Sequence, residues 1–139
     1  MEKRKGFTLI ELMVVILIVS ILAGVAIPLM QGRIDSAKWS EANATAGTIR
    51  TAVRAYFAED PTACGDLATN SLDDEDTRNA LGFTEADLTG TYFGPSNYTI
   101  STINGTSGLA SITVSAGDGL EGEYVLSEDG DWSKSAASE

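Results

Sequence analysis

The sequence predicts an α+β protein in which the C-terminal half of one long N-terminal α-helix packs on a small antiparallel sheet. Three observations support this class. Apolar residues dominate from Phe7 to Met30, helical periodicity continues to Asp60, and short alternating segments between glycine-rich turns follow Pro95. Because helices and sheets bury their apolar faces by packing together, we expect strands to cover the second half of the helix.

Charge divides the chain into two parts. Its 139 residues carry 9 basic and 20 acidic side chains, a formal charge of −11, although the mean hydropathy is +0.02. Residues 1–58 hold 7 basic and 4 acidic groups, and residues 59–139 hold 2 and 16. The acidic part disfavours a nucleic-acid surface, and the absence of histidine removes the commonest general base and zinc ligand. We therefore predict no enzyme, no cofactor and no specific nucleic-acid partner.

Residues 7–30 are predicted to span a membrane. As a helix, these 24 residues are about 36 Å long, more than the roughly 30 Å of a hydrocarbon core. Lys3, Arg4 and Lys5 precede the segment and predict a cytoplasmic N-terminus, with the rest of the chain outside. A secretory signal peptide is the alternative, but its apolar core is usually only about 7–15 residues long.

Glu11 lies one turn inside this apolar segment. A carboxylate costs roughly 2.5–3.5 kcal/mol at the centre of a membrane helix and less near its end. A plain anchor or signal peptide has no need of such a group. Its position therefore indicates a partner of positive charge.

The segment around it, Lys5-Gly6-Phe7-Thr8-Leu9-Ile10-Glu11-Leu12, resembles the processing and methylation motif of type IV pilins and type II secretion pseudopilins. The resemblance implies that residues 1–6 are a leader, that prepilin peptidase cuts between Gly6 and Phe7, and that Phe7 becomes N-methylated. It also implies the pilin fold. After the cut, the amine of Phe7 lies near the depth of Glu11 in the membrane.

Pairing between these two groups is the predicted basis of assembly. Each buried charge is costly alone, so the Phe7 amine of one subunit and Glu11 of its neighbour relieve both penalties when they meet. We expect Glu11 to set the axial register of a polymer in this way. The other interpretation is a carboxylate tolerated near the membrane surface.

Residues 31–60 are predicted to continue as an amphipathic helix. Its apolar stripe recurs at steps of three and four residues, and Asp60-Pro61 ends it. Gly24 and Pro28 weaken the helical ladder upstream and predict either a simple kink or, by resemblance to pilins, local melting in a filament. The predicted stripe consists of Ile34, Ala37, Ala42, Ala46, Ile49, Val53, Tyr56 and Phe57.

Residues 61–139 are predicted to form a globular head. Its helical candidates are Leu72–Leu81, capped by Ser71, and a short turn from Thr84 to Leu88. Three strands follow, with Trp132 closing the edge of the sheet: Tyr98–Ile103, Leu109–Ala116 and Gly122–Ser127. Cys64 is the only cysteine, so the disulfide loop common among type IVa pilins is absent, and Cys64 is interpreted as structural.

Acidic clusters and asparagines raise further possibilities. Carboxylates suit calcium, yet their spacing matches no EF-hand and a solvated acidic surface is the simpler interpretation. The calcium candidates are Asp118, Glu121, Glu123, Asp129 and Asp131, supported by the resemblance to pseudopilins, and the run Asp73–Asp76. Asn43, Asn97 and Asn104 match the glycosylation pattern, which is frequent by chance in a threonine-rich chain.

The expected function is that of a structural subunit of a type IV pilus, in adhesion, motility or DNA uptake. Its expected partners are copies of itself, prepilin peptidase, the inner-membrane assembly machinery and, before assembly, the lipid bilayer. The precursor is expected in the inner membrane and the product in an extracellular pilus. One alternative is the major pseudopilin of a type II secretion system, in a periplasmic pseudopilus. Another is a membrane-anchored binding domain that never polymerises.

Overall fold

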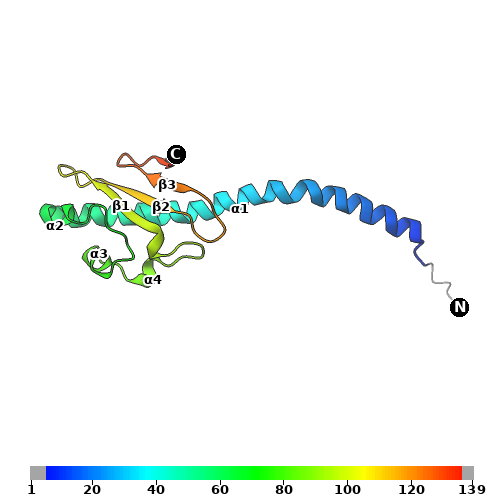
Figure 1. The fold of residues 1–139 in the computed structure, drawn as a ribbon, viewed down its shortest axis with the longest axis horizontal. Coiled ribbons are helices and arrows are strands. Elements are labelled where there is room, and N and C mark those ends of the chain that lie inside the picture. Colours follow the sequence, from blue (N-terminus) through cyan, green and yellow to red (C-terminus); the bar gives the residue numbers. More distant parts are fainter. Residues whose placement is uncertain (1–5, 136–139) are drawn as a thin grey trace. The chain divides into compact units, whose positions relative to one another are not determined.

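The computed structural model describes residues 6–135 (Figure 1). Its order is four α-helices, one short 3-10 helix and four strands. The chain divides into two compact units, one up to Ala37 and the other from Lys38 onward. The α+β class is confirmed. The second unit, the head, thus takes in the last part of the long helix as well as residues 61–135.

Among the described residues, the first unit holds residues 6–8 and the part of helix α1, Leu9–Glu59, that ends at Ala37. α1 continues without a break through Gly24 and Pro28. The hydroxyl of Ser20, the main polar interruption of the apolar run, donates to the carbonyl of Ile16 at 2.6 Å. The Ser20 hydroxyl therefore has a hydrogen-bond partner within its own helix, which a polar group needs in an apolar surrounding.

In the head, α1 buries one stripe of side chains. Ala42, Ala46, Ile49 and Val53 are fully buried, which confirms the centre of the predicted stripe. Trp39 joins them at 7% exposure. Ile34 and Ala37, the predicted start of the stripe, are exposed and belong to the first unit. Alanine at two positions brings the helix backbone close to the residues packed on it.

Asp60-Pro61 ends α1 as predicted and also begins a short helix that is not among those predicted from the sequence. Asp60 is extended, and its carboxylate accepts hydrogen bonds from the amides of Thr62 and Ala63 at 3.0 and 2.9 Å. Pro61 is the first residue of α2, Pro61–Gly65, where a missing N–H costs nothing. The same dipeptide therefore stops one helix and caps the next.

The predicted helix Leu72–Leu81 is too long. α3 spans Glu75–Ala80 and is capped by Asp74, not by Ser71. Tertiary pairing decides this, because the Leu72 amide donates to the carbonyl of Tyr98 at 2.9 Å and Ser71 bridges to Thr99. Residues 69–72 thus run beside a strand and cannot be helical.

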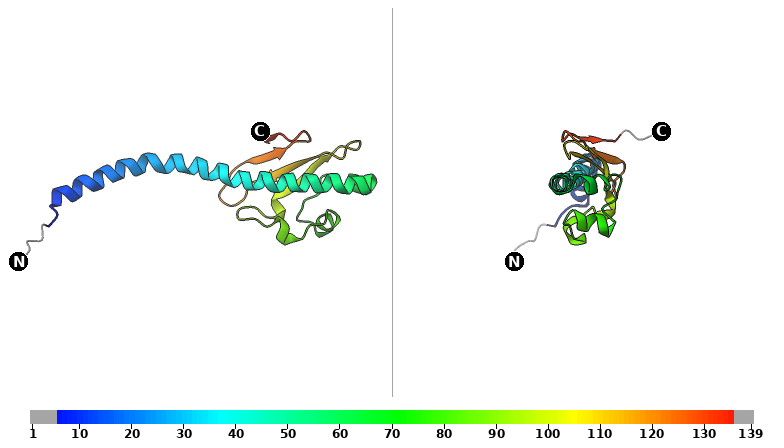
Figure 2. Two further views of the ribbon diagram at one scale, coloured as in Figure 1. Left: turned by 180° about the vertical axis from the view of Figure 1, so that it is seen from behind. Right: turned by 90° about the vertical axis from the view of Figure 1, so that its left-hand side faces the viewer.

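The Thr84 turn is confirmed as α4, Glu85–Leu88. The amide and hydroxyl of Thr84 donate to one oxygen of Asp87 at 2.8 and 2.7 Å. The 3-10 turn η1, Pro95–Asn97, then leads into the sheet. α3 and α4 lie on one side of α1 and the sheet lies on another (Figures 1 and 2).

The sheet has four antiparallel strands in the order β1-β2-β3-β4. β1 is Tyr98–Ile103, as predicted, and β2, Ala110–Ser115, and β3, Glu123–Leu126, are each one residue shorter at both ends than predicted. β4 is Trp132–Lys134, a full strand where the sequence indicated only a closing residue. Alternate residues Ile100, Ile112 and Val114 face the core and are fully buried.

Aromatic side chains fill one end of the head. The Trp39 ring lies 5.3 Å from that of Phe93 and 4.4 Å from that of Tyr124. Tyr124 and Trp132 stack at 5.1 Å. Offset aromatic pairs add about 0.5–1.5 kcal/mol each to the effect of area burial. This cluster joins α1, β3, β4 and the loop before η1, so it fixes the C-terminal strands on the helix.

Candidate assembly site at the start of the helix

The first turn of α1 is closed by a reciprocal pair of hydrogen bonds between Thr8 and Glu11. The amide and the hydroxyl of Thr8 both donate to Oε2 of Glu11, at 2.9 and 2.6 Å. The Glu11 amide points back to the Thr8 hydroxyl at 3.4 Å. This is a capping box, in which a Thr before the helix and a Glu three residues later satisfy amides that have no helical partner.

Sequence reasoning missed Thr8, although the spacing Thr-x-x-Glu was readable. The capping box gives Glu11 a role within one chain, in addition to the predicted role between chains. Both Thr8 donors use the same carboxylate oxygen, Oε2. The other oxygen, Oε1, receives no hydrogen bond from the described residues. Glu11 is therefore held in place and still has an acceptor to offer.

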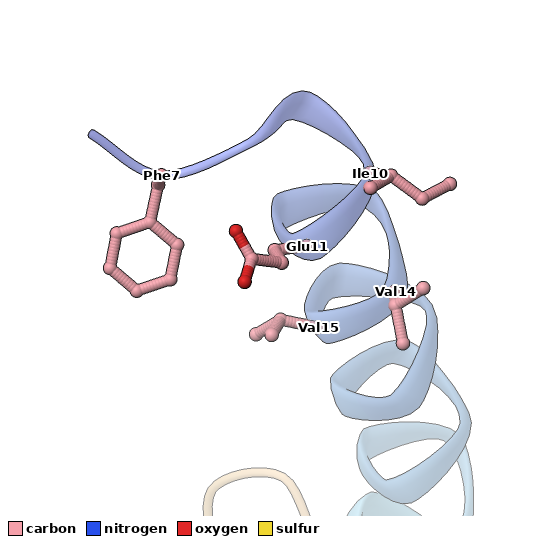
Figure 3. A pocket seen from close by; sticks show the side chains of 5 residues that line it. All are labelled: Phe7, Ile10, Glu11, Val14 and Val15. Atoms are coloured by element: carbon pink, nitrogen blue, oxygen red, sulfur yellow. The ribbon is translucent and has the colours of Figure 1, made fainter. Parts of the chain in front are cut away.

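Figure 3 shows the side chains around this carboxylate. The Phe7 ring, Glu11 and Val15 project from one flank of the helix start, and Ile10 and Val14 lie beside them. These five residues line a shallow open hollow whose only charged group is Glu11. The Glu11 carboxylate is thus bordered by apolar side chains. Within lipid or among other helices, where water does not screen it, an ion pair at this carboxylate would be stronger than in water.

Residues Gly6 and Phe7 precede the helix. Residues 6–8 have no regular structure, Phe7 is 85% exposed, and no side chain lies near the Cα of Gly6. Gly6 and Phe7 thus lie in an exposed segment before the helix. The remainder of the predicted leader, Met1–Lys5, lies outside the described residues.

The apolar side chains that follow lie on all sides of the helix and remain exposed. The large ones between Phe7 and Met30 are 47–85% exposed. By length and composition α1 includes one stretch able to cross a membrane, with a mean hydropathy of 2.9 over 18 residues and no burial in the described chain. A helix that is apolar all round needs a lipid or protein surrounding.

The carboxylates considered for calcium do not converge. No group of three or more acidic or cysteine side chains between residues 6 and 135 is placed to hold a metal ion. Asp118 instead offers its main-chain carbonyl to Lys38 at 3.4 Å. In the run Asp73–Asp76, Asp74 accepts from the Thr77 amide and hydroxyl at 2.9 and 2.7 Å. These carboxylates form a capped helix start and an acidic surface.

The asparagines of the three glycosylation patterns serve the fold in part. Asn97 receives the amide of Gly94 at 2.8 Å and donates to the carbonyl of Ala116. Asn104 lies at the tip of the β1–β2 hairpin and accepts the amides of Thr106 and Ser107. Asn43 is half-buried on α1. Modification of any of them stays a prediction.

The fold and this site define a class of protein: an apolar N-terminal helix that starts with a capped carboxylate directly after a Gly-Phe bond, and a small α+β head. Residues 1–27 match the family described as the prokaryotic N-terminal methylation motif. The chain therefore carries this motif.

The chain is also similar to known fimbrial and pilin proteins, over stretches longer than the motif. The chain is 36% identical over 88 residues to a fimbrial protein of Pseudomonas aeruginosa, a match that covers 63% of this chain and 54% of the relative. It is 43% identical over 75 residues to the type IV major pilin protein PilE of Neisseria gonorrhoeae, covering 50% and 45%. With the type IV major fimbrial protein FimA of Dichelobacter nodosus it shares 48% over 50 residues, covering 36% and 32%.

These matches confirm the resemblance to type IV pilins inferred from residues 5–12. The chain spans about half the length of the relatives it matches, or less. No solved structure matches it significantly. The pilin relatives and the apolar helix fit a precursor in the membrane and a product in a pilus.

Proposed function

We propose that the protein is the structural subunit of a type IV pilus, which polymerises through its N-terminal helix into an extracellular filament. One observation carries the proposal: the methylation motif, residues 1–27, coincides with an apolar helix that the described chain leaves uncovered. An apolar surface of this extent is stable first in the bilayer and then among the same helices of other subunits. Polymerisation supplies that second surrounding.

The processing step prepares the site. Prepilin peptidase removes residues 1–6 by cutting after Gly6, and the new Phe7 amine is methylated. The cut removes three basic side chains and one acidic side chain, which leaves 6 basic and 19 acidic side chains in the mature chain. The mature subunit is thus more acidic than the precursor, and its amine lies four residues before Glu11.

Assembly then pairs the Phe7 amine of one subunit with Glu11 of its neighbour. The capping box holds the carboxylate at the helix start, and Oε1 accepts the incoming amine. A subunit inserted at another height leaves two charges unpaired in an apolar surrounding, which costs several kcal/mol for each charge. Register along the filament follows from this penalty. Gly24 and Pro28 provide the point where the helix kinks or melts in the filament.

The lipid bilayer and the inner-membrane assembly machinery are the partners of the precursor, whose head lies outside the cytoplasm. The relatives described above are fimbrial and pilin proteins, and no finding favours the type II secretion alternative. The filament itself, and not the single chain, performs adhesion, motility or DNA uptake. The chain supplies the polymer.

Mass spectrometry of the protein from its native cells, together with electron microscopy of those cells, tests the proposal. We expect a mature N-terminus at methylated Phe7, and filaments that disappear when the gene is deleted and return when it is restored. An intact Met1, cleavage in the region of Ala26, or a deletion strain with unchanged filaments would contradict it. Loss of exoprotein secretion without loss of surface filaments would assign the chain to secretion instead.

A further inference from the structure

A pair of arginines interrupts the acidic surface of the head. Arg50 and Arg54 lie one turn apart on α1 and, with Thr51 and Leu109, line a hollow of about 130 Å³. Arg54 is exposed, and its guanidinium takes part in none of the side-chain hydrogen bonds found within residues 6–135. Like charges four residues apart on a helix repel each other. An anion in the hollow would remove that repulsion.

Two other cations of the head, Lys38 and Arg78, already have partners within the chain. Lys38 donates to the carbonyl of Asp118 and lies 5.1 Å from the centre of the Tyr92 ring. Arg78 donates to the carbonyls of Leu72 and Asp73 at 2.8 and 2.5 Å. Arg50 uses one nitrogen on the carbonyl of Glu128, but its Nε is buried and has no partner among the described residues. Arg54 is therefore the exposed guanidinium of the hollow, and Arg50 is the half-buried one beside it.

A densely acidic segment lies on a different flank of α1. Glu75 and Asp76 are exposed in the first turn of α3 and, unlike Asp74, take no part in capping. The end of α3 lies beside Ala52, Ala55 and Glu59 of α1, whereas the arginine hollow opens toward Leu109 of the β1–β2 hairpin. The exposed face of α1 between the two flanks has small side chains: Ala44, Thr48, Thr51, Ala55 and Ala58.

We propose that the arginine hollow of one subunit binds the Glu75-Asp76 segment of a second copy of the chain. Guanidinium groups bind carboxylates through paired hydrogen bonds, and the small side chains on the exposed face allow a neighbour to come close. The inference rests on the proposed function, because it places this contact between heads of one filament. Through this contact the strongly acidic heads attract each other and keep one orientation.

The location of the two surfaces determines the kind of assembly. The hollow and the acidic segment lie on different flanks of α1, so one head can offer its hollow to one neighbour and its acidic segment to the next, which is a heterologous contact. A heterologous contact that does not close into a ring produces an open helical polymer. The charge pattern of the head therefore supports the same assembly as the N-terminal helix.

Charge reversal in the full chain, expressed in its native cells, tests the contact by the yield of sheared filaments. Arg54→Glu and Asp76→Arg should each lower the yield by roughly tenfold, since like charges then face each other. The chain that carries both changes should recover most of the yield. Lys134→Glu on β4 and Glu85→Arg on α4 are matched controls, because they alter the net charge equally at other exposed sites, and they should leave the yield unchanged.

Cross-linking locates the contact independently. With Arg54→Cys and Asp76→Cys in one chain, oxidation of filaments should produce a ladder of disulfide-linked multimers, which each single change does not, because Cys64 is buried. A product that stops at the dimer, no cross-link at all, normal yield from Arg54→Glu, or failure of the double reversal to recover would overturn the inference. Absence of filaments from the unaltered chain would instead contradict the proposed function.

Discussion

The guanidinium of Arg50 on α1 donates a hydrogen bond to the main-chain carbonyl of Glu128, in the turn between β3 and β4. The carboxylate of the same Glu128 accepts from the Thr102 hydroxyl and the Asn104 amide, both at 3.3 Å. One residue of a turn therefore ties the helix to the β1–β2 hairpin and to the C-terminal strands. Stability of the head depends on this connection because no disulfide secures its C-terminal part.

Replacement of Arg50 by Met should lower the free energy of unfolding by about 1–2 kcal/mol, since it removes a charged donor from a partly buried carbonyl but keeps the length of the side chain. Denaturant unfolding of the full chain in detergent, followed by tryptophan fluorescence, measures the change. Arg54→Met is the matched control on the same helix and should leave stability within about 0.5 kcal/mol. Equal losses in the two variants would refute the role of the Glu128 contact.

Glu11 combines capping with charge, and two substitutions separate these roles. Glu11→Gln keeps a capping-box residue but removes the charge, whereas Thr8→Ala keeps the charge but removes the cap, at a cost of about 1 kcal/mol to the helix start. We expect Glu11→Gln to abolish filaments and Thr8→Ala to reduce them only modestly, as counted by electron microscopy. Normal filaments from Glu11→Gln would show that capping alone suffices.

Gly108 should resist substitution. Its φ is +66°, and a Cβ there would overlap the ring of Phe57. Gly108→Ala should therefore destabilise the head by about 1–3 kcal/mol, measured by the same unfolding experiment. Gly105, in the same hairpin, has open space around its Cα and no positive φ, so Gly105→Ala is the control and should be close to neutral. An unchanged midpoint for Gly108→Ala would contradict the packing described.

Acid should weaken the head through its helix caps. Hydrogen bonds from the Thr77 hydroxyl and amide lower the pKa of Asp74, and those from Thr84 lower the pKa of Asp87, below the ordinary value of 3.8. A carboxyl group with a lowered pKa in the folded state stabilises the fold above its unfolded pKa and loses that effect as the pH falls through the folded value. Stability should thus decline below pH 3.8, with these two caps contributing.

The double change Asp74→Asn and Asp87→Asn isolates this effect. Measured between about pH 5 and pH 2, its unfolding midpoint should fall less steeply than that of the unaltered protein. Asp66→Asn, at an exposed residue, is the control and should keep the original slope. If the unfolding midpoints of all three proteins fall equally steeply with pH, the two helix caps do not contribute to the acid sensitivity.

Cys64 should be inert in the folded protein. Burial, with a smaller contribution from the charge of Asp60, raises the pKa of its thiol, so little thiolate is present near neutral pH. Iodoacetamide should leave native filaments unmodified and label the chain only after denaturation, as read by mass spectrometry. A cysteine at the exposed position of Thr62 provides the reactive control. Rapid labelling of Cys64 without denaturant would mean that the loop around α2 opens.

Local sequence patterns predicted the secondary structure correctly where a single residue, or the periodicity of apolar residues, decides the conformation. Pro61 ends α1, Thr84 caps α4, and alternation defines the buried face of β2, because each of these depends on neighbours in the chain. The motif at residues 5–12 likewise predicted the family likeness. The Thr8–Glu11 capping box was equally local and was overlooked because the cost of a carboxylate in a membrane dominated the interpretation of Glu11.

Other features depended on contacts that sequence spacing does not reveal. Leu72 was predicted to be helical but is not, because its amide donates to the carbonyl of Tyr98, 26 residues later in the chain. β4 pairs antiparallel with β3, and Trp132 of β4 stacks on Tyr124 of β3. The grouping of Arg50 and Arg54 beside Leu109, away from α3, likewise required the path of the hairpin around the helix.

The sequence by itself determined the apolar helix, the processing motif, the acidic head and the class of fold, because hydropathy, periodicity and charge are properties of neighbouring residues. Only the tertiary structure decided which cations remain free, which glycines are constrained and which surfaces lie on separate flanks of α1. Those outcomes depend on pairings between distant residues, whose entropic cost is offset only when the whole core forms.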